Sequence, residues 1–456
     1  MAHPMTGGKG TLSLEELQDS DIDTVIVAAP DMSGRLLGKR ISKRKFADYI
    51  EGGVPMSNCV FGWDLPQDIG LEVPFAGFHN GWHDFMLVPD LATIRRAAWL
   101  DRTAIVMADI VDEHSRELIE IAPRTILRRQ IERFAEQGYS ANVGTELEFH
   151  MYRETYDDLR QRGFHHRTPT TLIHSDYTVQ QVNAWEPFFQ DVRRKLDESG
   201  MDVDLSQGEW GLGQWEINLT YGDALDMCDR HVLYKLALKD MATRAGYSVT
   251  FMPKPNAGLV GSSCHVHLSL DADGANPMWD PQDDHHISDV MRHGIGGILA
   301  NAAALMAWYA PTINSYRRTN SDDFAGSGAT WGFDNRTVSC RVLGTSPSSL
   351  RLEWRVPGAD VNPYLVVAGL IASIGSGVES KADPGVPASG DAYQERVRAF
   401  PAHLGEAAER FIASDAVQQM FGEEVVEQYG LTARWEWTAF MNAVTDWEHE
   451  RYYESI

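Results

Sequence analysis

The stretch Gly144-Thr145-Glu146-Leu147-Glu148-Phe149 carries two acids, two residues apart, among small and apolar neighbours. Alternate side chains of a β-strand point to the same face, so Glu146 and Glu148 share one face and Leu147 and Phe149 share the other. An ordinary surface strand with one wet face would show the same alternation. The stretch therefore predicts a strand with an acidic face, and other parts of the chain must decide whether that face is functional.

Three further runs combine charged and apolar residues in a similar way: GEWGLGQWEINL at 208–219, SCHVHLS at 263–269 and RLEWR at 351–355. If all four runs line one cavity, five carboxylates converge there. At ~5 Å and an effective dielectric constant of ~20, each pair of like charges would cost roughly 3 kcal/mol. Oxygen ligands with one imidazole suit Mg²⁺ or Mn²⁺, whereas no cysteine spacing suits a thiolate-bound zinc ion. The runs therefore predict a site for divalent cations.

Arginines are crowded into a later part of this acidic chain: Arg317, Arg318, Arg336, Arg341, Arg351 and Arg355. Arginine recognises phosphate and carboxylate groups in a bidentate manner, although each of these residues could instead form a surface salt bridge. Divalent cations, arginines and acids in one site suggest phosphoryl transfer, in which catalysis consists mostly of charge neutralisation and positioning. The sequence has no GxxxxGK[ST] motif, which excludes a P-loop enzyme.

Composition limits the partners and the compartment that we expect. The 456 residues include 40 Lys and Arg against 65 Asp and Glu, which gives a net charge of −25. Such a surface repels phosphate groups, so we expect neither nucleic acid nor an anionic membrane as a partner. Four scattered cysteines without a CxxC pair, and an N-terminus without an apolar leader, predict a reduced, cytoplasmic protein.

Predicted helices and strands follow one another without a regular βαβ order. The apolar spacing after Pro123 predicts a helix that Gly138 closes, followed by a strand over 143–152. A longer apolar region predicts a buried helix over 293–309. The chain is therefore predicted to be a mixed α+β protein.

Six motifs together are far more specific than any one of them: GTELEF, EWGLGQWEINL, KPNAGLVGSSCHVHLSL, NSYRR, DNRTVSCR and RLEWRVPGADVNPY. In this order and at these separations they resemble the signatures of the glutamine synthetase superfamily, and the likeness extends from Asp31 over nearly the whole chain. The resemblance implies a small N-terminal β-grasp domain at 17–114. It implies a large catalytic domain at 121–456, in which helices flank a curved antiparallel sheet. It also implies a homododecamer of two hexameric rings, with active sites between neighbouring subunits.

The resemblance further assigns roles to individual residues. Two or three Mg²⁺ or Mn²⁺ ions would be held by two groups of residues: Glu148, Glu209 and Glu216, and Glu146, His265 and Glu353. The nucleotide or its phosphates would contact Asp204, His267, Ser269, Arg336, Arg341 and Arg351. Glutamate or its developing phosphate would contact Gly261, Arg318, Arg336 and Arg355. Of these, Arg318 and Arg336 are the expected catalytic residues.

The implied reaction has two steps. The γ-carboxylate of glutamate attacks the terminal phosphate of ATP and forms γ-glutamyl phosphate. An amine then attacks this acyl phosphate, and phosphate leaves. Water must be excluded, because it would hydrolyse the intermediate.

Departures from the pattern of the ammonia-using members are concentrated on the amine side. Phe324 stands where these members have a glutamate, with Asp322 and Asp323 adjacent, and the ammonium-site motif near the subunit junction is missing. Asp64 is a possible replacement for that motif. A larger amine needs room and an apolar wall, which Phe324, Trp63 and Trp82 could supply unless they are ordinary core residues.

The pattern therefore resembles glutamate–polyamine and glutamate–ethanolamine ligases. Two alternatives remain: a glutamine synthetase that uses ammonia, and a regulatory member that has kept the fold but lost the chemistry.

Overall fold

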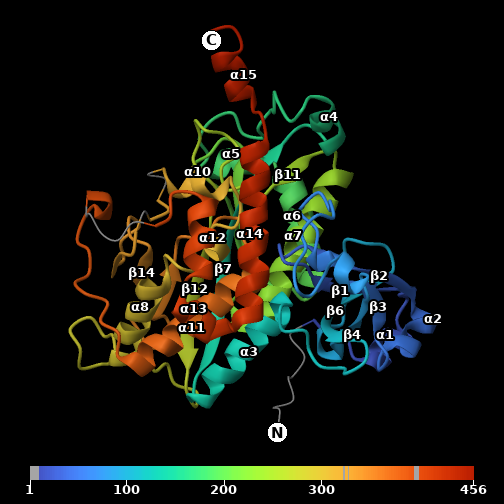
Figure 1. The fold of residues 1–456 in the computed structure, drawn as a ribbon, viewed down its shortest axis with the longest axis horizontal. Helices are drawn as coiled ribbons and strands as arrows, with labels where there is room; N and C mark the ends of the chain where they lie inside the picture. Colours follow the sequence, from blue (N-terminus) through green and yellow to red (C-terminus); the bar gives the residue numbers. More distant parts are fainter. Residues whose placement is uncertain (1–9, 322–323, 327, 395–399) are drawn as a thin grey trace.

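The computed structural model describes residues 10–321, 324–326, 328–394 and 400–456, and these residues form two sheets of unequal size (Figure 1). The smaller sheet is N-terminal and has the strand order β2-β1-β6-β4-β3, with β5 paired to β6. Its strands are β1 (Thr24–Pro30), β2 (Leu36–Ser42), β3 (Val54–Ser57), β4 (Asp84–Pro89), β5 (Arg95–Arg96) and β6 (Thr103–Asp112). Strands β1 and β6 run parallel, and the other neighbours run antiparallel.

The larger sheet has the strand order β13-β14-β15-β12-β7-β9-β8, with β10 and β11 also paired to β7. Its strands are β7 (Ser140–Tyr152), β8 (Val203–Gly208), β9 (Gln214–Leu219), β10 (Gly222–Asp223), β11 (Ser248–Thr250), β12 (Cys264–Asp271), β13 (Trp331–Phe333), β14 (Cys340–Leu343) and β15 (Arg351–Trp354). All neighbours in it are antiparallel except β13 and β14. The predicted α+β class, with a largely antiparallel main sheet, is confirmed.

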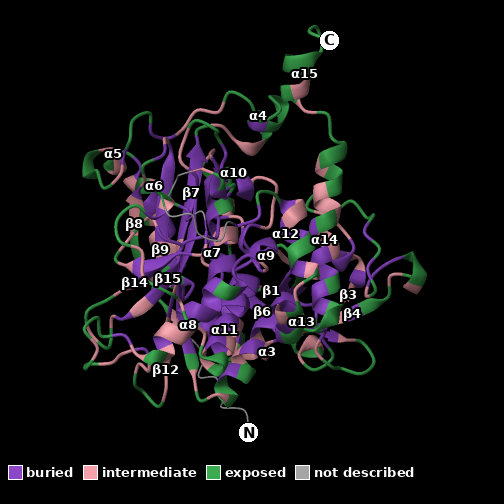
Figure 2. Cartoon of the chain, turned by 60° about the vertical axis from the view of Figure 1, so that its left-hand side comes forward, coloured by how far each residue is buried: buried purple, intermediate pink, exposed green. Residues whose placement is uncertain are grey.

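Helices cover one face of the larger sheet and fill the space between the two sheets. The helices are α1 (Leu14–Asp19), α2 (Lys43–Phe46), α3 (Pro123–Glu136), α4 (Tyr156–Gln161), α5 (Val179–Asn183), α6 (Glu186–Glu198), α7 (Ala224–Arg244), α8 (Asp289–Asn301), α9 (Met306–Tyr309), α10 (Ser315–Thr319), α11 (Pro363–Ser380), α12 (Leu404–Ile412), α13 (Asp415–Phe421), α14 (Glu423–Asn442) and α15 (Asp446–Tyr452). Helix α7 packs on β7, and α11 packs against α3, α7 and α8. Figure 2 shows that the buried residues are concentrated in the larger sheet and in α7 and α11.

The period of two in the central strands divides the larger sheet into an apolar and a polar face. Leu147 and Phe149 of β7, Val266 of β12 and Trp354 of β15 are almost fully buried. The charged residues between them point to the opposite face. Burial of one face therefore fixes the register, because a shift of one residue would put every charge into the core.

The prediction of one continuous helix over 293–309 is wrong, because two helices occupy this stretch. Helix α8 ends at Asn301, and a separate short helix, α9, starts at Met306. The side-chain amide of Asn301 donates a hydrogen bond to the carbonyl of Gly297 at 3.0 Å, and this bond competes with the backbone bonds of a continuing helix.

Among the described residues, α11 is the one helix long and apolar enough to cross a membrane, but 78% of it is buried inside the protein. It is a core helix.

A buried ion-pair network joins the N-terminal sheet to the helices. Arg124 of α3 is 2% exposed, and its guanidinium donates to both carboxylate oxygens of Asp229 on α7 at 3.1 and 3.0 Å. The same guanidinium contacts Asp90 at 2.7 Å and Asp109 of β6. The hydroxyl of Tyr364 on α11 donates to Asp229 at 2.6 Å. Four elements therefore meet at one arginine, whose removal would leave a buried carboxylate without its counter-charge.

We predict that Arg124→Ala lowers the free energy of unfolding by about 3–5 kcal/mol, because Asp229 would stay buried and uncompensated. The matched control is Arg129→Ala on the same helix, whose exposed pair with Glu120 should contribute less than about 1 kcal/mol. Chemical denaturation followed by tryptophan fluorescence measures both values. Equal losses in the two variants would contradict the role given to the network.

Candidate active site and metal centre

The pairing of β7 with its neighbours brings the charged residues of distant sequence runs side by side. Glu146 lies directly opposite His265 of β12, and Glu148 lies opposite Glu216 of β9. One strand further, Glu353 of β15 lies opposite His267. The four runs therefore share the polar face of one sheet.

One group of ligands on this face is compact. Glu146, His265 and Glu353 each offer an atom within 4.8 Å of the others. The Nδ1 atom of His265 lies 3.2 Å from Glu146 Oε2 and 3.5 Å from Glu353 Oε1. Two carboxylates and one imidazole form a donor set that fits Mg²⁺ or Mn²⁺.

Protonation states in this group favour cation binding. Burial, helped by the nearby Arg355 guanidinium, lowers the pKa of His265, so its imidazole is neutral and has a free lone pair at neutral pH. Burial alone would raise the pKa of Glu146, but the hydrogen bonds to His265 and His267 hold that pKa well below its usual range. Burial alone would raise the pKa of Glu353, but the charge of Arg355, joined by that of His265 when its imidazole is protonated, lowers this pKa.

Glu353 is held by arginines as well as by the histidine. Its side chain is 1% exposed, Arg341 Nη1 donates to its Oε2 at 3.0 Å, and Arg355 Nη1 pairs with its Oε1. Arg341 also pairs with Asp334. The arginines thus fix the position of this carboxylate beside Glu146 and His265.

A second acidic group, Glu148, Glu209 and Glu216, lies beside the first and shows the repulsion expected of crowded carboxylates. Burial and the charge of Glu148 raise the pKa of Glu209 to about 8. Burial and the charges of Glu209, Glu148 and Glu146 raise the pKa of Glu216 well above its usual value. A divalent cation would relieve this repulsion, so the group also fits the proposed ion.

Amide side chains orient the second group, and the sequence analysis missed them. Gln207 donates to Glu209 at 2.8 Å, Asn218 to Glu216 at 2.8 Å, and Gln214 to Glu148 at 2.8 Å. Gln214 and Asn218 flank Glu216 at a spacing of two on β9, so the same alternation that revealed the acids could have revealed them.

Histidine and serine side chains extend the polar face along β12. His267 Nε2 lies 2.8 Å from Glu146 Oε1, and Arg351 Nε donates to His267 Nδ1 at 3.0 Å. With Nδ1 as acceptor, His267 donates through Nε2 to the carboxylate. Ser269 is two residues further along and faces the same side.

The structure also brings Gly261 and Arg318 together. A Cβ atom on Gly261 would lie 2.4 Å from the Pro253 carbonyl oxygen and 2.9 Å from Arg318 Cγ, so only glycine fits. The Gly261 carbonyl accepts a hydrogen bond from Gln214 at 3.0 Å, which ties it to the second acidic group. Arg318 is 2% exposed and donates to the carbonyls of Val356 and Arg355 at 2.8 and 3.1 Å.

Phe324 lies at the edge of this site. Its side chain is 54% exposed. Its backbone has a φ of +57°, a conformation that residues other than glycine rarely adopt. Its carbonyl accepts a hydrogen bond from Arg355 at 3.3 Å. Asp322 and Asp323 lie outside the described residues.

Arg336 is exposed and faces a loop that the sequence analysis did not identify. Burial and the charge of Glu148 raise the pKa of Asp176 in this loop, and the charge of Arg336 partly offsets that rise. The neighbouring Ser175 hydroxyl donates to the Glu209 carbonyl at 3.3 Å, so this loop lies over the second acidic group. No sequence pattern marks Asp176, because it lies in an irregular segment.

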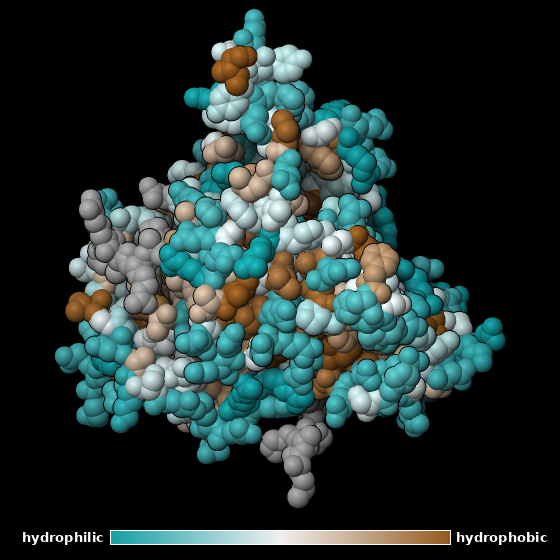
Figure 3. Space-filling model, in the orientation of Figure 1, coloured by the Kyte–Doolittle hydropathy of each residue, from teal (hydrophilic) through white to brown (hydrophobic). Residues whose placement is uncertain are grey.

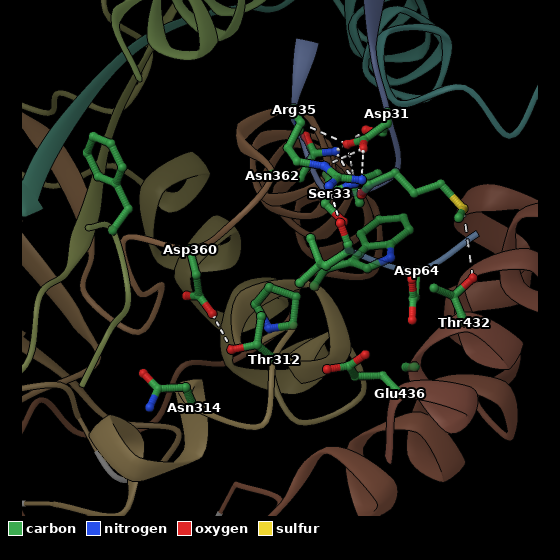
Figure 4. Close-up of a pocket in the computed structure, with 18 of the residues that line it drawn as sticks. Asp31, Ser33, Arg35, Asp64, Thr312, Asn314, Asp360, Asn362, Thr432 and Glu436 are labelled. Atoms are coloured by element: carbon green, nitrogen blue, oxygen red, sulfur yellow. Dashed lines mark hydrogen bonds and ion pairs between the residues drawn. The ribbon is translucent and has the colours of Figure 1, made fainter. Parts of the chain in front are cut away.

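Two predicted site residues, Asp204 and Asp64, do not lie on the polar face of the larger sheet in a single chain. Asp204 is exposed on the edge strand β8, at an irregularity where its register with β9 shifts. Asp64 lines a separate cavity with Arg35 and Glu436 (Figure 4), whose lining includes none of the six candidate metal ligands. Their predicted contacts with nucleotide and substrate stay predictions.

A polar sheet face that combines two acidic groups with a histidine and several arginines defines a metal-dependent enzyme of phosphoryl transfer. The family profile described as "Glutamine synthetase, catalytic domain" matches residues 120–452, and the chain belongs to the glutamine synthetase family.

Named relatives agree with this assignment. The chain is 42% identical to the "Gamma-glutamylethanolamide synthetase" of Streptomyces coelicolor over 100% of this chain and 98% of that protein. It is 34% identical to the "Glutamate--isopropylamine ligase" of a Pseudomonas species, over 96% and 97% of the two chains. A solved structure titled "Apo GmaS without ligand" superimposes with a TM-score of 0.84 at 25% identity, over 97% and 99% of the two chains.

We predict that Mg²⁺ stabilises the protein more at high pH than at low pH. The raised pKa of Glu209, about 8, favours the ion-free fold while the group is protonated, and this contribution is lost as the pH rises through that value. The melting temperature of the ion-free protein should therefore fall as the pH rises from about 4.5, the ordinary pKa of the group, to about 8, and Mg²⁺ should restore it.

Glu216→Gln should raise the melting temperature of the ion-free protein at high pH, because one repelling charge is gone, and should abolish most of the Mg²⁺ effect. The exposed Glu427→Gln on α14 is the control of equal charge change. An unchanged Mg²⁺ effect in Glu216→Gln would show that the ion binds elsewhere.

Proposed function

We propose that this enzyme joins the γ-carboxylate of glutamate to an amine, ethanolamine or a polyamine, at the expense of ATP. The observation that carries the proposal is a contrast within one site. Glu146, His265 and Glu353 are grouped on the sheet face with Arg341 and Arg355 beside them, whereas the edge expected to bind ammonium has an exposed phenylalanine, Phe324. The printed names of the relatives, which ligate glutamate to ethanolamine or isopropylamine, support a substituted amine.

In the first step, the glutamate carboxylate attacks the terminal phosphorus of ATP, and the bond to the bridging oxygen breaks to release ADP. We propose that Arg318 and Arg336 are the catalytic residues, and that with Gly261 and Arg355 they hold glutamate and the transferred phosphate. Arginine suits this role because its charge does not change near neutral pH. Two or three Mg²⁺ or Mn²⁺ ions on the six acidic and histidine ligands would supply further neutralisation of the phosphates.

In the second step, the amine nitrogen attacks the acyl carbon, phosphate leaves, and the nitrogen loses a proton. Phe324 would exclude water and pack on the carbon chain of the amine. Contacts to the nucleotide are assigned to Asp204, His267, Ser269, Arg336, Arg341 and Arg351. Asp64 would reach a substrate only in the active site of a neighbouring subunit.

Self-association is part of the proposal, because such a neighbour is needed. Helix α15 projects from the body of the protein (Figure 1), and Figure 3 shows apolar side chains at the end of this projection. Trp447 is 64% and Tyr453 is 84% exposed there. Exposed apolar residues on a projecting segment are typical of an interface, which supports self-association; the proposed assembly is a homododecamer of two hexameric rings.

We predict that ADP release will require glutamate, Mg²⁺ and an amine together, with ethanolamine or a polyamine giving at least about tenfold higher kcat/KM than ammonium. The assay compares ethanolamine, isopropylamine, putrescine, spermidine and ammonium at equal concentrations. The highest kcat/KM with ammonium would favour glutamine synthesis instead. Nucleotide binding without turnover on any amine would favour a regulatory protein.

We predict that Phe324→Glu shifts the preference towards ammonium by about tenfold or more, because a carboxylate binds a bare ammonium ion and helps to remove its proton. Phe324→Leu is the matched apolar control and should retain the original preference. The ratio of kcat/KM values for ethanolamine and ammonium is the measurement. An unchanged ratio in Phe324→Glu would remove this residue from the amine site.

A further inference from the structure

One buried amide, the side chain of Gln214, contacts two different parts of the active site. Gln214 is the first residue of β9, lies opposite His150 of β7 and is 1% exposed. Its Nε2 atom donates to Glu148 Oε2 at 2.8 Å and to the Gly261 carbonyl at 3.0 Å. Glu148 is a candidate ion ligand, and Gly261 is a candidate contact of glutamate. The amide therefore joins the ion side of the site to the substrate side.

The partners of this amide allow it only one orientation. A primary amide has two N–H groups and one carbonyl oxygen. Both N–H groups of Gln214 face oxygen acceptors, and its Oε1 accepts from the backbone N–H of Gly211 at 2.8 Å. A flipped amide would place its oxygen against the Glu148 carboxylate and the Gly261 carbonyl, and an N–H group against the N–H of Gly211. Each attraction would then become a repulsion.

Close packing around the amide also limits its rotation. A Cβ atom on Gly211 would collide with Gln214 Oε1 and would lie 3.1 Å from His150 Nε2, so the backbone of this turn rests directly on both side chains. His150 and Ser262 are 0% exposed, and His150 Nδ1 lies 3.0 Å from Ser262 Oγ. The amide is therefore enclosed by β7, by the turn at Gly211 and by the segment 261–262.

The Glu148 carboxylate takes one of its three hydrogen bonds from Gln214. The other two come from Ser263, whose backbone N–H donates to Oε2 at 2.9 Å and whose hydroxyl donates to Oε1 at 2.5 Å. Groups that donate to an ion ligand set its direction, and their removal weakens ion binding. Loss of the Gln214 amide should therefore be measurable as a loss of ion affinity.

The backbone of Gln214 closes the turn that carries a second ion ligand, independently of its side chain. The Glu209 N–H donates to the Gln214 carbonyl at 3.0 Å, and the Gln214 N–H donates to the Gly211 carbonyl at 3.0 Å. A substitution at 214 leaves both bonds in place. The effects of such a substitution can therefore be assigned to the amide and not to loss of the turn.

We propose that Gln214 is a positioning residue, which holds the ion ligand Glu148 and the glutamate-binding backbone of Gly261 in their relative places through one amide. The inference rests on the proposed function, because that function assigns Gly261 to glutamate. Gln214 acts through these two groups and takes no part in bond making or breaking.

A second glutamine on the same face provides a matched comparison. Gln207 of β8 donates to two candidate ion ligands, Glu209 at 2.8 Å and Glu216 at 3.4 Å. In the described part of the chain it has no hydrogen bond to the segment 261–263. Its removal should therefore affect the ions but not glutamate.

The test is Gln214→Met, which removes both donors and keeps the length of the side chain. We expect the affinity for Mn²⁺ to fall about tenfold, because Glu148 loses a donor. At saturating Mg²⁺ and ADP, the affinity for glutamate should fall at least about fivefold, because the Gly261 carbonyl is no longer held. The paramagnetic resonance signal of free Mn²⁺ measures the first affinity, and calorimetric titration measures the second. Wild-type affinity for either ligand in the folded variant would overturn the proposal.

Controls separate positioning from a general disturbance of the polar face. Gln207→Met should weaken Mn²⁺ binding and keep the wild-type affinity for glutamate, and Gln214→Met should keep the wild-type affinity for ADP. An equal loss of glutamate affinity in Gln207→Met, or a loss of ADP affinity in Gln214→Met, would overturn the proposal. Gln214→Asn withdraws the amide by one methylene and should give the same two losses. It takes the place of Gln214→Met if melting curves show that the latter does not fold.

ADP release in the presence of glutamate and an amine distinguishes failure of this inference from failure of the proposed function. If the wild-type protein releases ADP and Gln214→Met binds both ligands normally, the positioning role is overturned and the ligase function stands. If Gln214→Met loses both affinities but the wild-type protein releases no ADP with any amine, the ligase function is overturned and the positioning role stands.

Discussion

Repulsion among carboxylates on one face of a sheet is the constraint on which the rest of the molecule depends. Glu148, Glu209 and Glu216 are close enough that the pKa values of the latter two are raised, and Glu146 adds its charge to the same face. A protein tolerates such crowding only where the fold holds the groups in place and cations offset their charge. The fold supplies part of the offset itself, because histidines and arginines hold Glu146 and Glu353 in their charged forms.

The apolar half of the same strands provides the rigidity that this crowding requires. Leu147 and Phe149 alternate with the acids of β7 and are 1% and 0% exposed. Because these side chains are locked against the helices, the strand cannot rotate or slip to separate its charges. The hydrogen bonds from Gln207, Gln214 and Asn218 then set the directions of individual carboxylates. Burial on one face therefore stabilises an arrangement on the other face that would be unfavourable alone.

How far the sequence predicts this site follows from the same alternation. A period of two in a strand reveals which residues of that strand share a face, so Glu146 could be grouped with Glu148, and His265 with His267, before the structure was known. Pairing between strands is not encoded in the period, and the motif resemblance supplied it. Asp176 could not be found, because an irregular loop has no period from which the direction of a side chain can be inferred.

Helix ends and chain-to-chain contacts mark further limits of what the sequence predicts. Helix α8 ends at Asn301, whose side-chain amide donates to the Gly297 carbonyl, and apolar spacing does not detect such a bond. Asp64 resembles a residue of a site shared between neighbouring subunits, and in a single chain it lines a different cavity. A motif identifies such a residue but does not determine which chain it serves.

The two sides of the active site are connected through a single arginine. Arg355 pairs with Glu353 through one nitrogen and donates to the Phe324 carbonyl through another. The segment that carries Phe324 is therefore attached to a carboxylate of the compact acidic group, and a change in charge at that group acts on the guanidinium that holds the segment. Because Arg355 binds the backbone carbonyl of Phe324 and not its side chain, a substitution at 324 can retain this attachment. Under the proposed function, a substitution at position 324 would therefore change the amine side of the site and leave Arg355 and the charged face in place.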